Sequence, residues 1–150
     1  MNKKRPIGHE IKVLSNAVGR KFETNLRQND LDAATANHGR IMGYLRLNAD
    51  KSVYQRDIER EFNISRSTVT NILQLMEKKG YIERVCDEND MRLRRLILTD
   101  AGYRMDKKIL NCLEATDEQI VSGISESDLQ VFYKVAEQIK SNCKLNIMKG

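Results

Sequence analysis

The fold of this chain is decided by one stretch, residues 63–79, which reads Asn-Ile-Ser-Arg-Ser-Thr-Val-Thr-Asn-Ile-Leu-Gln-Leu-Met-Glu-Lys-Lys. Its apolar side chains fall at positions i, i+3, i+4 and i+7 and therefore share one helical face: Val69, Ile72, Leu73 and Met76. A second, out-of-phase stripe carries hydroxyls, amides and one cation, and no acid: Ser67, Thr70, Asn71, Gln74 and Lys78. Hydroxyls and amides can hydrogen-bond base edges or phosphates. The pattern indicates a recognition helix, although an ordinary amphipathic helix with a solvated face has the same spacing.

Signals on both sides of this stretch predict a helix-turn-helix. Ser65 is the expected N-cap, because its side-chain oxygen can accept from a free backbone N–H of the first turn. Gly80 ends the helix. Upstream, Ser52 and Gln55 have the spacing of a capping box that opens a short helix over about residues 53–62. Two helices joined by so short a turn, the second with a polar face, are typical of this motif.

The next segment predicts a β-hairpin. Residues 81–86 and 93–98 are short and rich in strand formers, and a charged loop separates them. A hairpin directly after a recognition helix is a wing, and its tip can reach the minor groove. The wing carries three cations: Arg92, Arg94 and Arg95. Asp90 stands two residues before Arg92, so its carboxylate can hold that planar guanidinium in place. The alternative is a charged hairpin that is only solvated.

Further amphipathic helices are predicted on both sides, over about residues 7–28, 36–48 and 100–123 and from 125 onward, with Thr99 and Ser125 as the expected N-caps of the last two. The apolar stripes of the first and last helices must be buried somewhere, and the last has heptad spacing. The expected fold is mainly α with a small β-hairpin wing. It comprises an N-terminal dimerisation helix (1–35), a winged helix-turn-helix lobe (36–99) and C-terminal dimerisation helices (100–150). Packing of the flanking helices on their own chain is the alternative to a homodimer.

The charge of the chain suits a polyanionic partner, but it is moderate and does not decide the function by itself. The net charge of +5 is concentrated in the first two thirds of the chain. No apolar run approaches the roughly 18 residues that span a bilayer. No secretory signal is visible either, so we expect a cytoplasmic protein without a membrane partner. The absence of a glycine-rich phosphate loop, a nucleophile elbow and a paired His and Cys predicts neither an enzyme nor a bound cofactor.

The histidines and cysteines suggest little further chemistry. His9 and His38 have no partner at ligand spacing, so we expect no metal site and place both at the surface or in an interface. Three cysteines without a Cys-x-x-Cys pair argue against a disulfide framework: Cys86, Cys112 and Cys143. Cys86 ends a wing strand two residues after Arg84, a position that would suit a redox-sensitive thiol. The other two lie on inward stripes.

Several runs of residues resemble the MarR family of winged-helix transcriptional regulators. They are Ile-Ser-Arg-Ser-Thr-Val-Thr at 64–70, Met-Glu-Lys-Lys-Gly-Tyr-Ile-Glu-Arg at 76–84, Asp-Met-Arg at 90–92, and Leu-Thr-Asp-Ala-Gly at 98–102. The order of the expected elements agrees over nearly the whole chain. Tyr54 departs from the family pattern, which commonly has a capping Thr there; Ser52 is expected to take over that cap.

The resemblance implies a homodimer that binds pseudo-palindromic duplex DNA, usually as a repressor. Carried over to this chain, the polar stripe would meet bases or phosphates in the major groove: Ser67, Thr70, Asn71 and Gln74. The first turn of the helix would meet phosphate through Ser65, Arg66 and Thr68. Arg92 would enter the minor groove, held by Asp90, with Arg94 beside it.

The resemblance also implies regulation. In the family, an effector near the junction of the dimerisation and DNA-binding lobes, or a cysteine oxidised there, changes the spacing of the two recognition helices. Ile11, Met42 and Met105 could contribute to an effector pocket among the first, second and fifth helices, although core packing explains these residues equally well. Cys86 is the candidate for oxidation. The alternatives are a winged-helix dimer that binds a protein or a small molecule, and a cysteine-based redox regulator. Salt dependence would separate DNA binding from protein binding, because phosphate contacts release counterions.

Overall fold

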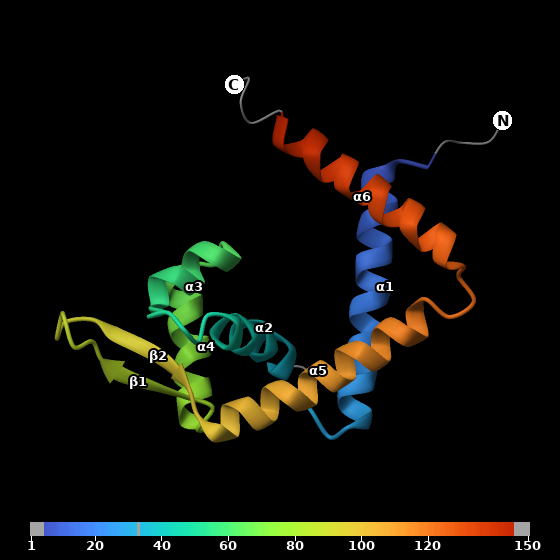
Figure 1. The fold of residues 1–150 in the computed structure, drawn as a ribbon. Helices are drawn as coiled ribbons and strands as arrows, with labels where there is room; N and C mark the ends of the chain where they lie inside the picture. The colour runs from blue at the N-terminus through green and yellow to red at the C-terminus, as the bar shows by residue number, and fades with distance from the viewer. Residues whose placement is uncertain (1–4, 33, 146–150) are drawn as a thin grey trace. The chain divides into compact units, whose positions relative to one another are not determined.

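The computed structural model describes residues 5–32 and 34–145, and the chain divides into two compact units, residues 1–116 and 117–150. The elements follow the predicted order (Figure 1): α1 Ile7–Gln28, α2 Ala34–Leu47, α3 Gln55–Phe62, α4 Arg66–Lys78, β1 Ile82–Cys86, β2 Arg94–Leu98, α5 Asp100–Ile120 and α6 Glu126–Leu145. The fold is mainly helical with one antiparallel hairpin, which confirms the expected winged helix-turn-helix.

The apolar face of α4 is the centre of the first unit. Val69, Leu73 and Met76 are completely buried. They pack in one cluster with residues from the other elements of the lobe: Ile41, Met42 and Leu45 of α2, Ile58 of α3, and Ile82, Leu96 and Leu98 of the hairpin. Each fully buried side chain of this size contributes roughly 1.5–3 kcal/mol by leaving water. This burial fixes which face of α4 points outward.

The start of α3 differs from the prediction. The helix begins at Gln55, and its N-cap is Tyr54 rather than Ser52. The capping box lies two positions later in the sequence than predicted, because the backbone N–H of Tyr54 donates to Oδ2 of Asp57 at 2.8 Å. The predicted pairing of Ser52 with Gln55 was therefore wrong. The Asp57 carboxylate, at the third helical position, accepts that N–H, and its negative charge interacts favourably with the positive N-terminal end of the helix dipole. Asp57 therefore takes the capping role that was predicted for Gln55.

The hairpin pairs Ile82 with Leu98 and Cys86 with Arg94 in antiparallel register. Its second strand is also attached to the helical part of the lobe, because the backbone N–H of Leu96 donates to the carbonyl of Val53 at 2.8 Å. Figure 1 shows the far end of the hairpin projecting beyond the helices of the lobe. The wing is thus anchored at its base, and its tip needs other contacts to be held.

Close backbone packing joins the hairpin to α5. Thr99 caps the helix as predicted, with its hydroxyl accepting from the N–H of Gly102 at 3.0 Å. A Cβ on Gly102 would lie 2.1 Å from the carbonyl oxygen of Tyr81, so only glycine fits there. The helix ends at Ile120 rather than at the predicted residue 123, although Gly123 does adopt a left-handed φ of +78°.

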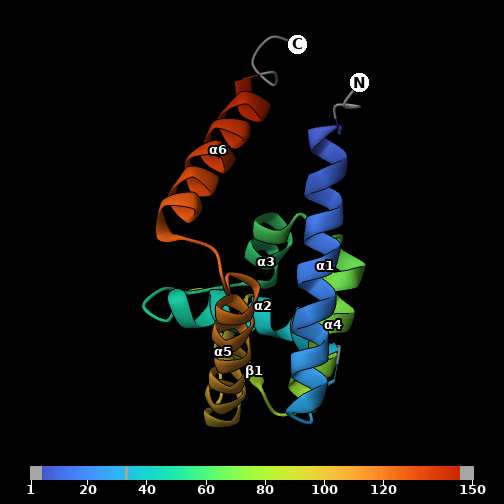
Figure 2. The same cartoon turned by 90° about the vertical axis from the view of Figure 1, so that its right-hand side faces the viewer.

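Polar contacts join α1 to α5 inside the first unit. Asn25 donates to the hydroxyl of Thr116 at 2.8 Å, and Thr116 donates to the carbonyl of Cys112 at 2.6 Å. A small second apolar cluster lies beside them, formed by Leu26, Leu31 and Cys112. Figure 2 shows α1 steeply inclined to α2, whose residues belong to the main cluster.

His38 corrects a second prediction. We expected it at the surface or in an interface, but its side chain is buried within the chain at the start of α2. Burial lowers the pKa of its imidazole, the charge of Lys79 lowers it further, and Asp32 opposes both. The neutral imidazole is therefore the form that this site favours. His9, in contrast, is exposed on α1.

The second unit holds α6 and the turn before it. Ser125 caps this helix as predicted, because its hydroxyl oxygen accepts from the backbone N–H of Asp128 at 3.1 Å and its hydroxyl also contacts the Asp128 carboxylate at 2.8 Å. Large apolar side chains of α6 remain exposed on the chain: Val131, Phe132, Tyr133 and Val135.

Candidate nucleic-acid interface

The first turn of α4 is capped by Ser65 and is exposed to solvent. The Ser65 side chain accepts from the backbone N–H of Thr68 at 3.3 Å, and the two hydroxyls lie 2.8 Å apart. The predicted N-cap is therefore confirmed. Arg66, Ser67 and Thr68 are exposed in this turn. The N-terminal end of a helix carries free N–H groups and a positive dipole, so these residues surround a natural position for a phosphate.

The polar stripe of α4 is outward as predicted, with one exception. Ser67, Asn71 and Gln74 are exposed, whereas Thr70 is half-buried. The hydroxyl of Thr70 accepts from Nε2 of Gln55 at 2.8 Å. With Lys78, which is also exposed, four side chains of the stripe are accessible to a ligand, and Thr70 faces α3.

Gln55 is a residue whose position in the site the sequence did not reveal. Besides Thr70, its amide nitrogen donates to the carboxylate of Glu59 at 3.1 Å. Its amide oxygen accepts from the guanidinium of Arg84 at 3.5 Å. One side chain therefore connects α3, α4 and β1. No local pattern indicates such a link, because its partners lie up to 29 residues away in sequence.

The tip of the wing contains the predicted pair of Asp90 and Arg92. Nε of Arg92 donates to Oδ1 of Asp90 at 3.1 Å, and its terminal nitrogen donates to Oδ2 at 3.3 Å. The hydrogen bond from Arg92 lowers the pKa of the Asp90 carboxyl. The Arg92 side chain is 90% exposed even so. A paired guanidinium at an exposed hairpin tip keeps one edge free for a second acceptor.

A hollow of about 360 Å³ separates the wing from α3 and the start of α4. We call it the arginine cleft. Its walls carry five arginines and a single acid: Tyr54, Gln55, Arg56, Glu59, Arg66, Arg84, Arg92, Leu93, Arg94 and Leu96. Glu77 pairs with Arg84 at 3.3 Å and Asp90 pairs with Arg92 at 3.1 Å, so the excess positive charge comes from Arg56, Arg66 and Arg94. Such a concave, cationic surface attracts a polyanion.

The arginine cleft contains residues that the sequence did not single out, Arg56 above all. The guanidinium of Arg56 lies over the ring of Tyr54, 5.1 Å from its centroid. The predicted residues Arg66, Arg92 and Arg94 all line the same cleft. The structure thus brings the first turn of α4 and the wing arginines to one surface. Arg56 shows no sequence signal beyond its charge, since any exposed helix carries arginines.

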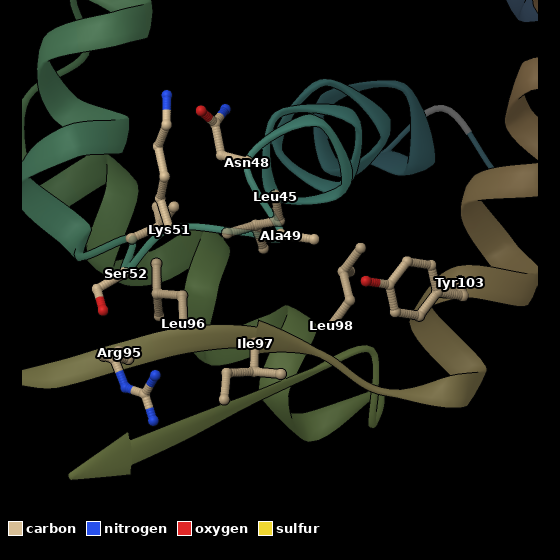
Figure 3. Close-up of a pocket in the computed structure, with 11 residues that line it drawn as sticks. Leu45, Asn48, Ala49, Lys51, Ser52, Arg95, Leu96, Ile97, Leu98 and Tyr103 are labelled. Carbon is tan, nitrogen blue, oxygen red and sulfur yellow. The ribbon is translucent and has the colours of Figure 1, made fainter. Parts of the chain in front are cut away.

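A second, smaller hollow of about 110 Å³ lies on another side of the wing, between the end of α2, β2 and the start of α5. Figure 3 shows that the ammonium group of Lys51 and the guanidinium of Arg95 point away from each other there. The hydroxyl of Tyr103 is directed toward Leu98. Because the polar groups diverge, this hollow does not form a convergent binding site.

The residues expected to meet an effector occupy different environments. Met42 is completely buried in the main cluster, and Met105 is partly buried against both clusters. Ile11 is 48% exposed on α1 and belongs to neither cluster. Met42 and Met105 thus take part in core packing, whereas Ile11 does not.

Cys86, the expected redox residue, is half-buried at the end of β1. Arg84, which could have activated its thiol, is turned to Glu77 and Gln55 instead. Cys112 is buried as expected, and burial raises the pKa of its thiol. Cys143 is exposed on α6 rather than inward. Within residues 5–32 and 34–145, no three His, Cys, Asp or Glu side chains gather closely enough to hold a metal ion.

None of the described helices is long and apolar enough to cross a bilayer.

Known proteins share this architecture. A model of the MarR family matches residues 34–93. The transcriptional regulator BilQ of Clostridioides difficile is 26% identical over 94 residues, which are 63% of this chain and 64% of BilQ, so the chain spans just under two thirds of that protein. The crystal structure of the transcription regulator MarR from Oenococcus oeni is 29% identical, with a TM-score of 0.65, and the match covers 91% of this chain and 99% of that one.

The structure of the S. aureus MepR–DNA complex has the same fold. It superposes with a TM-score of 0.78 at 22% identity, over 93% of this chain and 99% of that one. In this chain, the arginine cleft and the polar stripe of α4 lie on one lobe of that shared fold.

Proposed function

We propose that this chain is a homodimeric repressor of the MarR family of winged-helix transcriptional regulators, which binds a pseudo-palindromic DNA operator and responds to a small-molecule effector. The observation that carries DNA binding is the arginine cleft beside the exposed polar stripe of α4. The cleft supplies charge for phosphates, and the stripe supplies hydrogen-bonding groups for base edges.

The proposed contacts divide into two kinds. Ser65, Arg66 and Thr68 lie where the helix N-terminus can meet a phosphate, and such contacts strengthen binding to any sequence. Asn71 and Gln74 would face base edges in the major groove, because their amides suit the donor–acceptor pattern of adenine. Arg92 would enter the minor groove from the wing.

A selection from random duplexes tests this proposal. The full-length protein is incubated with a pool of random DNA, and the bound fraction is amplified and sequenced over several rounds. We expect a motif with two inverted half-sites, centred about one helical turn (roughly 34 Å) apart. A pool that stays random, or a motif without inverted symmetry, would contradict the homodimeric operator.

Exposed apolar side chains support the homodimer. Ile7, Ile11 and Leu14 lie exposed on α1, and Phe132 is 52% exposed on α6. Ile7, Ile11 and Leu14 share one face of α1, and an exposed apolar helix face of this kind favours coverage by another molecule. Sedimentation velocity should therefore give twice the chain mass of 17.3 kDa. Phe132→Glu should dissociate the dimer, while Gln130→Glu on the exposed part of the same helix should not.

The effector proposal rests on Met105, which contacts both apolar clusters and is only partly buried. A ligand that inserts between those clusters would change how α5 packs against α1 and α2. Small apolar molecules that release DNA from the wild-type protein, and do so less well with Met105→Ala, would support an effector site there. Release that is equal in both proteins would exclude Met105 from it.

A further inference from the structure

One tyrosine connects the helix-turn-helix to the wing. The hydroxyl of Tyr54 donates to Oδ2 of Asp87 at 2.5 Å, across 33 positions of sequence. Tyr54 is itself fixed, because its backbone N–H is bound to Asp57 as the cap of α3. This tyrosine stands where the family resemblance led us to expect a small capping residue. The side chain therefore does something that a threonine in that place could not do.

Asp87 organises the turn at the tip of the wing. Its second oxygen, Oδ1, accepts from the backbone N–H groups of Asn89 at 2.8 Å and Asp90 at 3.3 Å. Asp87 is only 6% exposed. The hydrogen bond from Tyr54 is the main cause that lowers the pKa of its carboxyl, and the same bond raises the pKa of the Tyr54 hydroxyl. A charged, nearly buried carboxylate is stable here because three donors surround it.

The wing turn also holds Arg92 in place. The carboxylate of Asp90 accepts from the backbone N–H of Arg92 at 3.0 Å as well as from its guanidinium. Backbone hydrogen bonds close the loop, from Leu93 N–H to the Asp90 carbonyl at 2.9 Å and from Asp87 N–H to the Leu93 carbonyl at 3.0 Å. An unbroken series of hydrogen bonds thus runs from Tyr54 through Asp87 and Asp90 to Arg92.

We propose that Tyr54 is a positioning residue for DNA binding, whose hydroxyl acts through Asp87 to hold the wing turn that presents Arg92. The proposal rests on the DNA-binding function proposed above. The ring of Tyr54 has a separate effect, because Arg56 stacks on it at the edge of the arginine cleft. Hydroxyl and ring can therefore be tested one at a time, by Tyr54→Phe and Tyr54→Leu.

A double-mutant cycle separates positioning from general stability. DNA affinity is measured by fluorescence anisotropy, on the selected duplex, for the wild type, Tyr54→Phe, Arg92→Ala and the double variant. We expect Tyr54→Phe to bind about 5- to 30-fold more weakly than the wild type. In the Arg92→Ala background, Tyr54→Phe should reduce DNA affinity little, because the arginine that Tyr54 positions is absent. Tyr103→Phe, which removes an exposed tyrosine hydroxyl elsewhere, is the matched control and should leave affinity unchanged.

Two outcomes of the cycle would overturn the proposal. One is an unchanged affinity of Tyr54→Phe. The other is an equal loss in both backgrounds, which would mean that Tyr54 acts on the fold as a whole. Tyr54→Leu should weaken binding further than Tyr54→Phe, also in the Arg92→Ala background, because it releases Arg56 as well.

Amide hydrogen exchange tests the same contact without DNA. In Tyr54→Phe the amide protons of Asn89 and Asp90 should exchange faster than in the wild type, while those of buried α4 residues should not change. Unchanged exchange at these two amides would overturn the hydrogen-bonded link itself. Failure of the unaltered protein to bind any duplex would instead overturn the proposed function, so the two failures are distinguishable.

Discussion

The recognition helix and the tip of the wing are held in place by different forces. Helix α4 is positioned by burial, because Val69, Leu73 and Met76 are completely enclosed. The wing tip buries no large apolar side chain, and Met91 there is 74% exposed. It is ordered by hydrogen bonds that begin at Tyr54 and Asp87. The position of α4 therefore depends on apolar packing, and that of the wing tip depends on charge and hydrogen bonding.

The largest effect should follow from removing a buried side chain of α4 from the apolar cluster of the first unit. Leu73→Ala removes a completely buried side chain and should lower the free energy of unfolding by about 2–5 kcal/mol. Leu75→Ala, two residues along the same helix at a side chain that is 40% exposed, is the control and should cost far less. Urea denaturation followed by circular dichroism measures both. Similar losses for the two variants would contradict the packing that orients α4.

The next effect concerns the wing and should leave stability almost untouched. Arg92→Ala removes an exposed guanidinium and should weaken DNA binding by about 1–3 kcal/mol. Arg20→Ala removes the same charge from the exposed surface of α1, so it controls for net charge. Anisotropy at moderate salt gives the affinities. Equal affinity of Arg92→Ala and the wild type would discard the minor-groove contact.

A smaller, sequence-dependent effect is expected from the polar stripe. Asn71→Ala should cost roughly 1–2 kcal/mol on the preferred duplex and should relax the preference at one base pair. Arg66→Ala, at the helix N-terminus, should weaken binding to all sequences alike. A panel of duplexes with single base-pair changes distinguishes the two. A uniform loss for Asn71→Ala would mean that this amide contacts the DNA backbone.

The smallest effect is a dependence of stability on pH that belongs to the wing. The pKa values of Asp87 and Asp90 are lowered in the folded protein, chiefly by the hydrogen bonds from Tyr54 and Arg92. Such groups stabilise the fold above the unfolded pKa of about 3.9, and this contribution is lost as the pH falls through the folded values. Urea midpoints should drop less on acidification in Asp87→Asn than in the wild type. The cost of Leu73→Ala should be the same at pH 7 and at pH 5, since no titration is involved.

Much of the fold and part of the candidate site could be predicted from the sequence. The helices and the hairpin follow from periodicity and caps, and Ser65, Thr99 and Ser125 all act as their spacing indicated. The pairing of Asp90 with Arg92 was likewise predictable, because the two residues are adjacent in a short turn. Local patterns were sufficient in these cases, where the interacting residues are neighbours in the chain, but they misplaced the equally local capping box of α3.

Contacts between distant residues could not be predicted in this way. The capping box was assigned to Ser52 and Gln55, whereas Tyr54 and Asp57 form it and Gln55 is used between helices. The bond from Tyr54 to Asp87 depends on how the hairpin folds back along Val53. The buried site of His38 depends on packing of α2 in the same manner. A single sequence contains no spacing rule for such pairs.

The most direct test of the central claim is the salt dependence of DNA binding by the wild-type protein. Anisotropy titrations are run with the selected duplex and a scrambled duplex over a series of salt concentrations. If the arginine cleft and the end of α4 engage phosphates, the logarithm of the binding constant should fall steeply with the logarithm of salt, by about 0.9 per phosphate contact. The selected duplex should remain the tighter ligand throughout. A shallow slope with equal affinity for both duplexes would contradict the assignment of this surface to DNA.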